Sequence, residues 1–424
     1  MADPVAVLDA PAPGADPFLA ARELLARLDA SAPDAPVVPE GQAALPPFAG
    51  GLVGYLAYDL GRRLEHLPEM AIHDQDLPEL RLGLYDRVLA WDRRTGCAWI
   101  GGRALDGDSG ALARRLAELR VLVGAVRHAA PEIAHEAEPI RFARTTTRAQ
   151  WLAGVSAVRD AIARGDIYQA NLTRRLEAPF LGDPWPLFRR LRTGDPALFA
   201  GYLDLGPSPV TGAARALLSA SPEPFLAVDG EGRVATDPIK GTRRRGHTRE
   251  EDRALARELL ASGKDRAENV MIVDVLRNDL GRVCLPGTVT VPRFLRLERT
   301  AAVQHLVTTV TGRLRPGKDA FDLLSATFPG GSITGAPKIR AMELIEELEP
   351  VRRGPYCGTL AWFGADGRMG SSILIRTLVA DGERLTLHVG GAITWRSDPD
   401  EEWDETVAKA RGPLSSIGAT EIEA

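Results

Sequence analysis

Strand-like runs dominate the C-terminal part of the chain: VTTVTGRL (307–314), YCGTLAWFG (356–364), SSILIRTLVA (371–380) and LTLHVGGAITW (385–395). Short runs rich in β-branched and aromatic residues and bounded by glycine are typical of strands. The last three follow one another with no helical run between them, whereas a doubly wound parallel sheet needs a crossover helix between strands. The sequence therefore predicts an α+β fold with large antiparallel sheets.

Helical patterns lie on both sides of further strand-like runs. Trp151, Val155, Val158 and Ile162 recur at helical spacing, and Gly165 follows as a C-terminal stop. The same spacing predicts helices at 17–29, 108–126, 249–261, 265–279, 319–327, 338–347 and 401–411. Most helices are thus expected beside the sheets rather than between successive strands.

The composition narrows the class of protein. The chain has 424 residues, 45% hydrophobic and 26% charged, with a net charge of −5, which is typical of a soluble globular protein. Nucleic-acid binders usually carry an excess of basic residues, which this negative net charge does not show. Its three cysteines suit neither a disulfide framework nor a zinc site, and neither a signal peptide nor a membrane span is evident. We expect a cytoplasmic protein with a small-molecule partner.

Two helical segments carry carboxylates that could hold a metal. Glu402, Glu405 and Lys409 share one face of the helix that Asp398 caps, although acidic residues in a first turn also suit a solvated helix start. Glu268 lies on an apolar face in another helix, where a salt bridge would also satisfy it. Carboxylates from two helices could together form a Mg²⁺ site.

Two further segments are candidates for chemistry. Lys240 lies in DPIKGT (237–242) and precedes several arginines, so it could serve as a nucleophile or as an ordinary surface lysine. The glycine-rich segment 328–338 opens a helix, where free N–H groups favour an anion. It lacks the Gly-Lys-Ser/Thr ending of a nucleotide P-loop. A carboxylate ligand is therefore expected there.

Together these segments resemble the chorismate-utilising enzymes, most closely the branch of aminodeoxychorismate synthase component I. The resemblance runs from residue 48 to the C-terminus. It is carried by GGLVGYLAYDLGRRLEHLPE (50–69), GDIYQANLTRR (165–175), SPEPF (221–225), DPIKGTRRRG (237–246), KDRAENVMIVDVLRNDLGRV (264–283), VQHLVTTVTG (303–312), FPGGSITGAPKIRAMELIEELEP (328–350), IRTL (375–378) and EEWDETVAKAR (401–411). It implies a two-sheet sandwich core flanked by helices, with a shortened N-terminal part.

The resemblance also implies a domain plan. Residues 1–15 are expected without fixed structure, 16–140 as a β-rich N-terminal region, and 141–424 as the chorismate-binding catalytic region, packed with the former as one unit. Relatives have more residues before the GGLVGY segment, part of which forms a tryptophan pocket, so tryptophan binding is not expected. Ala392 stands where relatives have glycine and would be strained if that position needs a positive φ.

The catalytic roles come from the resemblance. Glu268 and Glu405 match the Mg²⁺ ligands, with Glu402 close by. Lys240 matches the lysine that attacks the ring in the aminodeoxychorismate branch, where the anthranilate branch has alanine. Glu223 matches the general acid that protonates the departing hydroxyl.

The remaining site residues are also implied by the resemblance. His305 matches a histidine near the reacting ring, and Gln169 stands where water-adding relatives use lysine, so water addition is disfavoured. The substrate-binding set comprises Gly241, Thr242, Ser332, Tyr356, Arg376, Gly390, Gly391 and Lys409. Arg376 is expected to bind a carboxylate with its guanidinium fork.

The expected reaction is the amination of chorismate to 4-amino-4-deoxychorismate, on the route to 4-aminobenzoate and folate. No cysteine lies in a Gly-x-Cys-x-Gly setting, so ammonia is expected from a separate glutamine amidotransferase subunit. A downstream aminodeoxychorismate lyase would take the product. An anthranilate synthase component and a non-catalytic relative are the alternatives.

Overall fold

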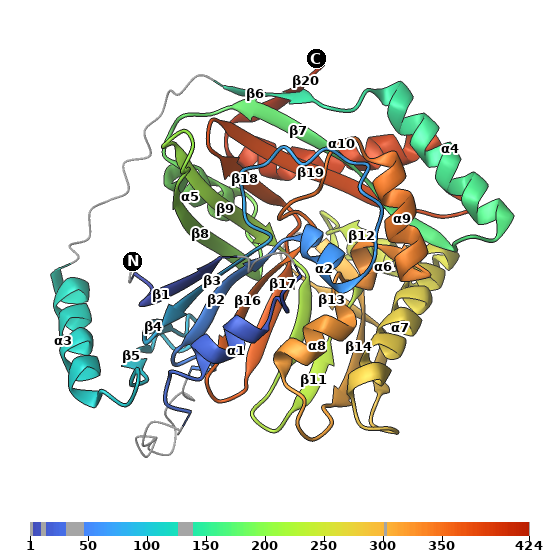
Figure 1. Ribbon diagram of the computed structural model, residues 1–424. Helices are drawn as coiled ribbons and strands as arrows, with labels where there is room; N and C mark the ends of the chain where they lie inside the picture. The colour runs from blue at the N-terminus through green and yellow to red at the C-terminus, as the bar shows by residue number, and fades with distance from the viewer. Residues whose placement is uncertain (1–2, 10–13, 31–45, 126–138, 301–302, 424) are drawn as a thin grey trace.

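Two large β-sheets organise the chain, and helices cover their outer faces (Figure 1). The computed structural model describes residues 3–9, 14–30, 46–125, 139–300 and 303–423. Nearly all paired strands in these sheets are antiparallel, and β20 with β6 is the parallel exception among the described strands. The predicted α+β class with large antiparallel sheets is confirmed.

The larger sheet has ten strands in the order β1-β3-β2-β16-β17-β10-β11-β14-β12, with β13 paired to β14 off this path. Its strands are β1 (Ala6–Asp9), β2 (Gly51–Leu56), β3 (Leu80–Tyr85), β10 (Pro224–Val228), β11 (Arg233–Thr236), β12 (Ile239–Arg244), β13 (Thr290–Arg299), β14 (Val303–Arg313), β16 (Thr359–Gly364) and β17 (Met369–Ile373). Because β2 pairs with β16, the predicted N-terminal and catalytic regions share one sheet.

The second sheet has eight strands in the order β20-β6-β7-β19-β18-β9-β8, with β15 paired to β7. They are β6 (Ile140–Arg144), β7 (Gln169–Pro179), β8 (Phe199–Pro207), β9 (Ala214–Ser221), β15 (Gly335–Ala336), β18 (Thr377–Asp381), β19 (Arg384–Ile393) and β20 (Ala419–Ile422). A separate hairpin consists of β4 (Arg87–Trp91) and β5 (Ala98–Gly102).

The described helices are α1 (Leu19–Leu25), α2 (Gly61–Leu64), α3 (Ser109–Ala125), α4 (Arg148–Arg164), α5 (Pro184–Gly194), α6 (Arg249–Ala261), α7 (Gly263–Val283), α8 (Ala320–Thr327), α9 (Lys338–Leu348) and α10 (Pro399–Ser416), with 3-10 turns η1 (Tyr58–Leu60) and η2 (Gly331–Ile333). The α4 prediction is confirmed by a capping box between Thr147 and Gln150 and by Gly165 at φ +83°. Helix α5 was missed by sequence reasoning, because its segment PWPLFRRLRTG holds two prolines.

Apolar side chains join the two sheets where strands from each pack face to face. Tyr55 of β2 lies in one buried cluster with Leu217 of β9 and Val379 of β18. Gly201 of β8 approaches Leu360 of β16 so closely that a Cβ there would lie 2.5 Å from Leu360 Cδ2. The two-sheet sandwich implied by the resemblance is thus present.

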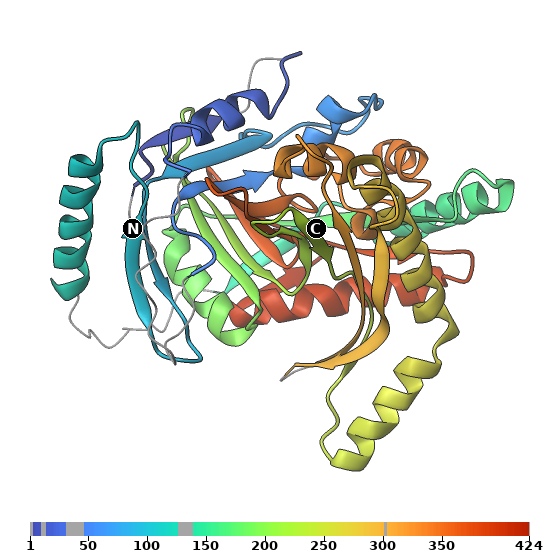
Figure 2. The same cartoon turned by 90° about the horizontal axis from the view of Figure 1, so that it is seen from below.

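Helices complete the core on the outer faces of the sheets. Helices α1, α7 and α8 pack against the ten-stranded sheet, where Phe321 stacks on Phe363 at 4.5 Å. Helices α5 and α10 pack on the eight-stranded sheet, and Figure 2 shows α10, in red, lying along it. Helices α4 and α9 enclose a further cluster with Trp403 of α10. Two of the candidate metal carboxylates therefore lie on a helix anchored to the second sheet.

The N-terminal expectation needs a correction. Residues 1–15 were expected without fixed structure, but Ala6–Asp9 form β1 and pair antiparallel with β3. The side chains of AVLD alternate between half-buried and exposed, as in an edge strand. Strand β3 supplies the partner, which the local sequence does not reveal. Residues 1–2 and 10–13 lie outside the described part of the chain.

The hairpin β4–β5 and helix α3 lie at one side of the molecule (Figure 1). Helix α3 packs mainly on β5, and Leu119 is its one buried side chain. Within the described residues, no helix is long and apolar enough to cross a lipid bilayer. The cysteines are free thiols, with Cys97 exposed and Cys284 and Cys357 buried.

Candidate active site

A bulge in β12 presents Lys240. Strand β12 pairs with β14 so that Lys240 lies opposite Leu306 and Thr242 opposite His305, with Gly241 as the extra residue between them. Gly241 has φ +80°, and a Cβ there would lie 2.9 Å from side-chain atoms of Asp265 and Leu259. Glycine is therefore required where the start of α7 packs against the bulge.

The Lys240 ammonium group reaches the glycine-rich segment. Its Nζ donates to the Ser332 carbonyl oxygen at 3.2 Å, and Ser332 lies in the turn η2. Its charge also acts on the carboxylates of Glu223, Glu268 and Glu405. The structure therefore brings Lys240 and the predicted acid and metal carboxylates together, although they come from four separate segments.

Glu223 lies in the short connection between β9 and β10 and is 8% exposed. Burial raises the pKa of its carboxyl, although the Lys240 charge and hydrogen bonds from Ser332 and the Ile239 backbone act in the other direction. A raised pKa favours the protonated form that a general acid needs. The electrostatics of Glu223 thus suit its predicted role.

Glu268 is a buried carboxylate in α7 with no partner among the described residues. It is 8% exposed and makes neither a hydrogen bond nor an ion pair there. Burial raises its pKa, the charges of Lys240 and Lys264 lower it, and the charge of Glu405 raises it further. A buried, unpartnered carboxylate is costly unless something else compensates its charge.

Helix α10 supplies the second set of charges. Lys409 Nζ lies 2.7 Å from Glu405 Oε1 and also donates to the Gly390 carbonyl of β19 at 2.7 Å. Burial acts to raise the pKa of Glu405, but the charge and hydrogen bond of Lys409 outweigh it, so the pKa is lowered. Glu402 is 2% exposed and accepts from Ser397 Oγ at 2.6 Å and Lys264 Nζ at 3.2 Å.

Strand β19 lies directly beside these carboxylates. A Cβ on Gly391 would lie 3.1 Å from Glu402 Oε2, 3.7 Å from Glu405 Oε1 and 3.9 Å from Lys409 Nζ. Gly391 therefore lies directly against the charged face of α10. A larger residue at this position would occupy the space between the strand and the carboxylates.

The donor set fits Mg²⁺ better than a transition metal. Within the described ranges, no cluster of three or more His, Cys, Asp or Glu side chains is arranged to hold a metal. Mg²⁺ needs fewer protein ligands, because it retains several waters and binds substrate oxygens. Unpartnered Glu268 and neighbouring Glu405, which pairs with Lys409 through Oε1, offer such oxygens, whereas Glu402 is bound by both Ser397 and Lys264. The residues fit a two-carboxylate magnesium site.

The predicted carboxylate-binding arginine has a partner that the sequence did not reveal. Arg376 adopts φ +48°, and its guanidinium pairs with Asp195 Oδ1 at 3.3 Å.

The predicted histidine His305 lies beside Thr242, with its Nδ1 2.9 Å from Thr242 Oγ1. Burial, and after it the charge of Arg376, lowers the pKa of His305. His305 is thus expected to be neutral beside Thr242 at neutral pH.

The aromatic and strand residues of the predicted set lie deeper. Tyr356 is 4% exposed, and its ring stacks on His388 at 5.0 Å. Gly390 pairs with Thr173 in β19 and β7. Gln169 is 1% exposed, and its Oε1 has no hydrogen-bond partner among the described residues. These positions are thus buried, and Gly390 meets the charged group through its carbonyl, which accepts from Lys409 Nζ.

Ala392 is not strained. It pairs with Asn171 in the regular part of β19, and the described non-glycine residues with positive φ are Asp106, Leu295, Cys357 and Arg376. The condition that would make alanine unfavourable at this position is therefore not met.

Sequence reasoning missed three residues that bind predicted site residues: Lys264, Ser397 and Asp195. Lys264 and Asp195 are far in sequence from Glu402 and Arg376, which they bind, and Ser397 belongs to no recognisable motif.

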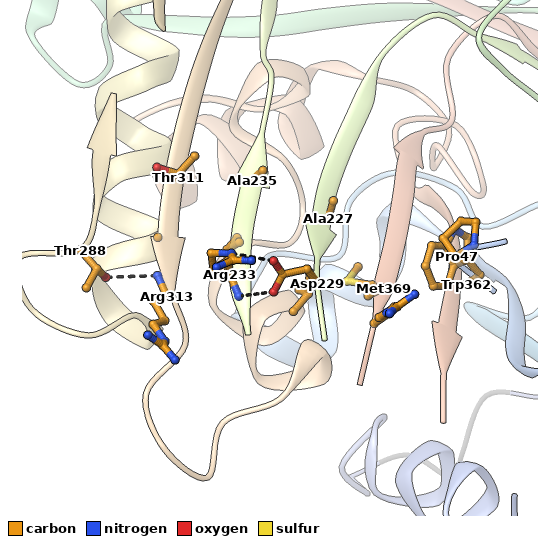
Figure 3. A pocket seen from close by; sticks show the side chains of 14 residues that line it. Pro47, Ala227, Asp229, Arg233, Ala235, Thr288, Thr311, Arg313, Trp362 and Met369 are labelled. Atoms are coloured by element: carbon orange, nitrogen blue, oxygen red, sulfur yellow. Dashed lines mark hydrogen bonds and ion pairs between the residues drawn. The ribbon is translucent and has the colours of Figure 1, made fainter. Parts of the chain in front are cut away.

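A groove on the ten-stranded sheet is separate from this site. It has a volume of about 760 Å³ and is lined by residues that include Trp362, Met369 and Ala227 (Figure 3). Within it Arg233 pairs with Asp229, and the Arg313 backbone donates to Thr288 Oγ1 at 3.1 Å. None of the lining residues is a predicted site residue.

Comparisons with known proteins agree with the fold and the motifs. The family model of the chorismate binding enzymes matches residues 8–415. Anthranilate synthase component 1 of Streptomyces coelicolor is 40% identical over 97% of this chain and 79% of its own length. Aminodeoxychorismate synthase component 1 of Salmonella typhimurium is 40% identical over 88% of this chain and 77% of its own.

A solved structure extends this agreement to three dimensions. Anthranilate synthase component I from Streptococcus pneumoniae superposes with a TM-score of 0.82 at 28% identity, covering 97% of this chain and 91% of that one. At 97% coverage of this chain, the similarity spans both sheets and the helices that flank them. With the family model covering nearly the whole length, the chain belongs to the chorismate-binding enzymes.

Proposed function

We propose that this protein aminates chorismate to 4-amino-4-deoxychorismate, with ammonia as the nitrogen source. The observation that carries the proposal is the position of Lys240, whose charge acts on the acid Glu223 and on Glu268 and Glu405 at once. The resemblance assigns a lysine at this motif position to the aminodeoxychorismate branch. A nucleophile at the centre of the site is what that branch requires.

The proposed reaction uses these side chains in two steps. The amine form of Lys240 forms a bond to the ring, while the ring hydroxyl leaves as water with the proton of Glu223. Ammonia then adds at the carbon that lost the hydroxyl as Lys240 leaves as its amine, and the ammonium so formed returns a proton to the Glu223 carboxylate. The raised pKa of buried Glu223 keeps its proton available for the first step. Two easier displacements replace one difficult displacement.

Substrate carboxylates need positive partners. Glu268 and Glu405 would hold Mg²⁺, which when bound would anchor a carboxylate of the substrate. Arg376, which donates to Asp195 through one nitrogen, keeps further N–H groups for a second carboxylate. Lys409 and the Gly390–Gly391 backbone would line the site beside them.

Ammonia needs a source outside this chain. We infer a glutamine amidotransferase partner, because relatives of this chain are named as components and the sequence shows no glutaminase nucleophile motif. The proposal also includes a separate lyase that acts on the product, and it places the protein in the cytoplasm. The isolated chain should use ammonium salts but not glutamine, and glutamine hydrolysis by the chain alone would contradict the partner.

Anthranilate synthesis is the second candidate, because relatives of that name are as similar to this chain as those of the first. The two reactions differ in their products. Chorismate, ammonium and Mg²⁺ incubated with the protein should give 4-amino-4-deoxychorismate, identified by mass and by conversion with added lyase. Anthranilate and pyruvate without the lyase would favour the second candidate, and no consumption of chorismate would contradict both.

Replacement of Lys240 tests its role directly. The variant Lys240→Ala should lower the amination rate sharply, because the covalent route is lost, while the circular dichroism spectrum and Tm stay close to wild type. The matched control is Lys318→Ala, which removes an exposed lysine paired with Asp322. Wild-type amination by the Lys240 variant would rule out the nucleophile.

A further inference from the structure

Lys264 reaches the predicted metal carboxylates from a second helix. It lies in the first turn of α7, which Ser262 caps, and its Nζ lies 3.2 Å from Glu402 Oε1. The Lys264 side chain is 44% exposed, whereas Glu402 is almost fully buried. The ammonium group thus enters the carboxylate cluster from the solvent side.

The charges around this cluster are nearly balanced without a metal. Glu268, Glu402 and Glu405 bring three negative charges, Lys264 and Lys409 lie beside two of them, and the charge of Lys240 acts on Glu268 and Glu405. The charges of Glu402, Glu268 and Glu405 all act on Lys264 and outweigh its burial, so its pKa is raised. Lys264 therefore remains an ammonium at neutral pH and interacts with the whole cluster rather than with one carboxylate.

The two lysines differ in how firmly they are held. Lys409 lies on the same helix as Glu405 and also donates to Gly390 of β19, so its ammonium bridges helix and strand. Lys264 has Glu402 as its single hydrogen-bond partner among the described residues. Its long, half-exposed chain can turn towards solvent without breaking any other contact.

We propose that Lys264 is a tethered counter-cation that occupies the carboxylate cluster in the metal-free protein, gives way when Mg²⁺ enters, and thereby lowers the affinity for Mg²⁺. The inference rests on the proposed magnesium site. Lys264 is a positioning residue, because it acts on the ligands of the metal rather than on the reacting atoms. It would keep metal binding reversible, with the ion held fully only when substrate oxygens complete its shell.

Coulomb's law gives the expected direction. An ammonium and a divalent cation attracted to the same carboxylates repel each other, and partial burial weakens the screening by water. Removal of the ammonium should therefore strengthen Mg²⁺ binding. It should also leave the metal-free carboxylates without their counter-charge and so destabilise the metal-free fold.

Isothermal titration of the full chain with MgCl₂, without chorismate, tests the proposal. Lys264→Gln should bind Mg²⁺ roughly tenfold more tightly than wild type. Lys264→Arg keeps the charge and should stay within about threefold of wild type. The matched control Lys318→Gln removes a lysine that pairs with Asp322 outside the site and should leave the Kd unchanged.

Thermal unfolding gives a second readout that is independent of activity. In EDTA, Lys264→Gln should have a lower Tm than wild type, and saturating Mg²⁺ should raise its Tm by more than it raises that of wild type. An unchanged or weaker Mg²⁺ affinity for Lys264→Gln would overturn the proposal. If Mg²⁺ binds wild type and Glu268→Gln equally, or binds neither, the magnesium site itself is wrong, and the role of Lys264 is wrong with it.

Discussion

At the scale of single residues, the site separates carboxyl groups by their surroundings. Glu223 and Glu268 are buried and have raised pKa values, whereas Lys409 lowers the pKa of Glu405. Similar side chains can thus serve as a proton donor or as charged ligands, because burial favours the neutral form and a neighbouring cation favours the charged one. The raised pKa of Glu223 suits a proton donor and the lowered pKa of Glu405 suits a charged ligand, whereas the ligand role of Glu268 comes from the resemblance.

Replacement of Glu223 should remove the proton donor. Glu223→Gln is expected to lower kcat by roughly 10²- to 10⁴-fold. In wild type the raised pKa keeps Glu223 protonated above the usual range of glutamate, so activity should fall on the alkaline side as this carboxyl ionises. Steady-state rates across pH measure both effects. A Gln variant with the wild-type rate and alkaline limb would assign the acid to another group.

Replacement of Glu268 should stabilise the metal-free protein. A carboxyl whose pKa is raised by folding stabilises the fold below its ordinary value of 4.5, and this contribution is lost as pH rises through the folded-state pKa. Above that window Glu268 is charged, buried and unpartnered. In EDTA at neutral pH, Glu268→Gln should therefore raise Tm by a few degrees while Mg²⁺ binding is lost. A lower Tm would show that the charge is compensated in the metal-free state.

At the scale of elements, the start of α10 sets the position of its carboxylates. Its N-cap Asp398 accepts from the backbone N–H groups of Asp400 and Glu401, and Pro399 follows at the first helical position. The cap fixes where the helix begins, and the spacing then places Glu402, Glu405 and Lys409 on one side, against Gly391 of β19. The position of the carboxylates thus depends on the helix start.

Loss of this cap should affect stability and metal binding together. Asp398→Ala is expected to cost about 1 kcal/mol of unfolding free energy in urea titration and to weaken Mg²⁺ binding measured by calorimetry. Asp183→Ala is the matched control, because Asp183 caps α5, a helix that carries none of the candidate metal carboxylates. It should show a similar stability loss with an unchanged Mg²⁺ affinity, and equal effects on Mg²⁺ would contradict the argument.

At the scale of the whole molecule, a buried ion pair contacts segments that lie far apart in the sequence. Arg353 is 2% exposed, binds both oxygens of Glu349, and donates to the carbonyls of Ile333 and Asn171. Its guanidinium lies 4.5 Å from the ring centroid of Tyr58, which comes from the N-terminal region. The pair thus links the glycine-rich segment 328–338, β7 and the N-terminal region.

Disruption of this pair should be severe. Arg353→Met leaves the Glu349 charge buried without its partner and should cost about 3–5 kcal/mol of unfolding free energy. Adding Glu349→Gln to that variant should recover part of the loss, because the stranded charge is removed. Urea unfolding of wild type, both single variants and the double variant measures the coupling. Additive losses would show that the two side chains act independently.

The outcome for individual elements shows what local patterns can predict. Helix α4 was predictable, because its apolar spacing and capping residues are local features. Strand β1 was not, because its stability depends on pairing with β3, more than seventy positions away. Motif positions identified Lys240, Glu223, Glu268 and Glu405, whereas Lys264 became visible only through its distance to Glu402.

The sequence by itself determined the α+β class and the positions of most helices and supplied the candidate site residues, because periodicity, caps and motifs are encoded along the chain. Tertiary structure alone decided the strand order, the missing partner of Glu268 and the charges around it. Burial and electrostatic neighbours arise from packing between segments far apart in sequence. They set the pKa of each carboxyl and the charge that a metal ion would meet.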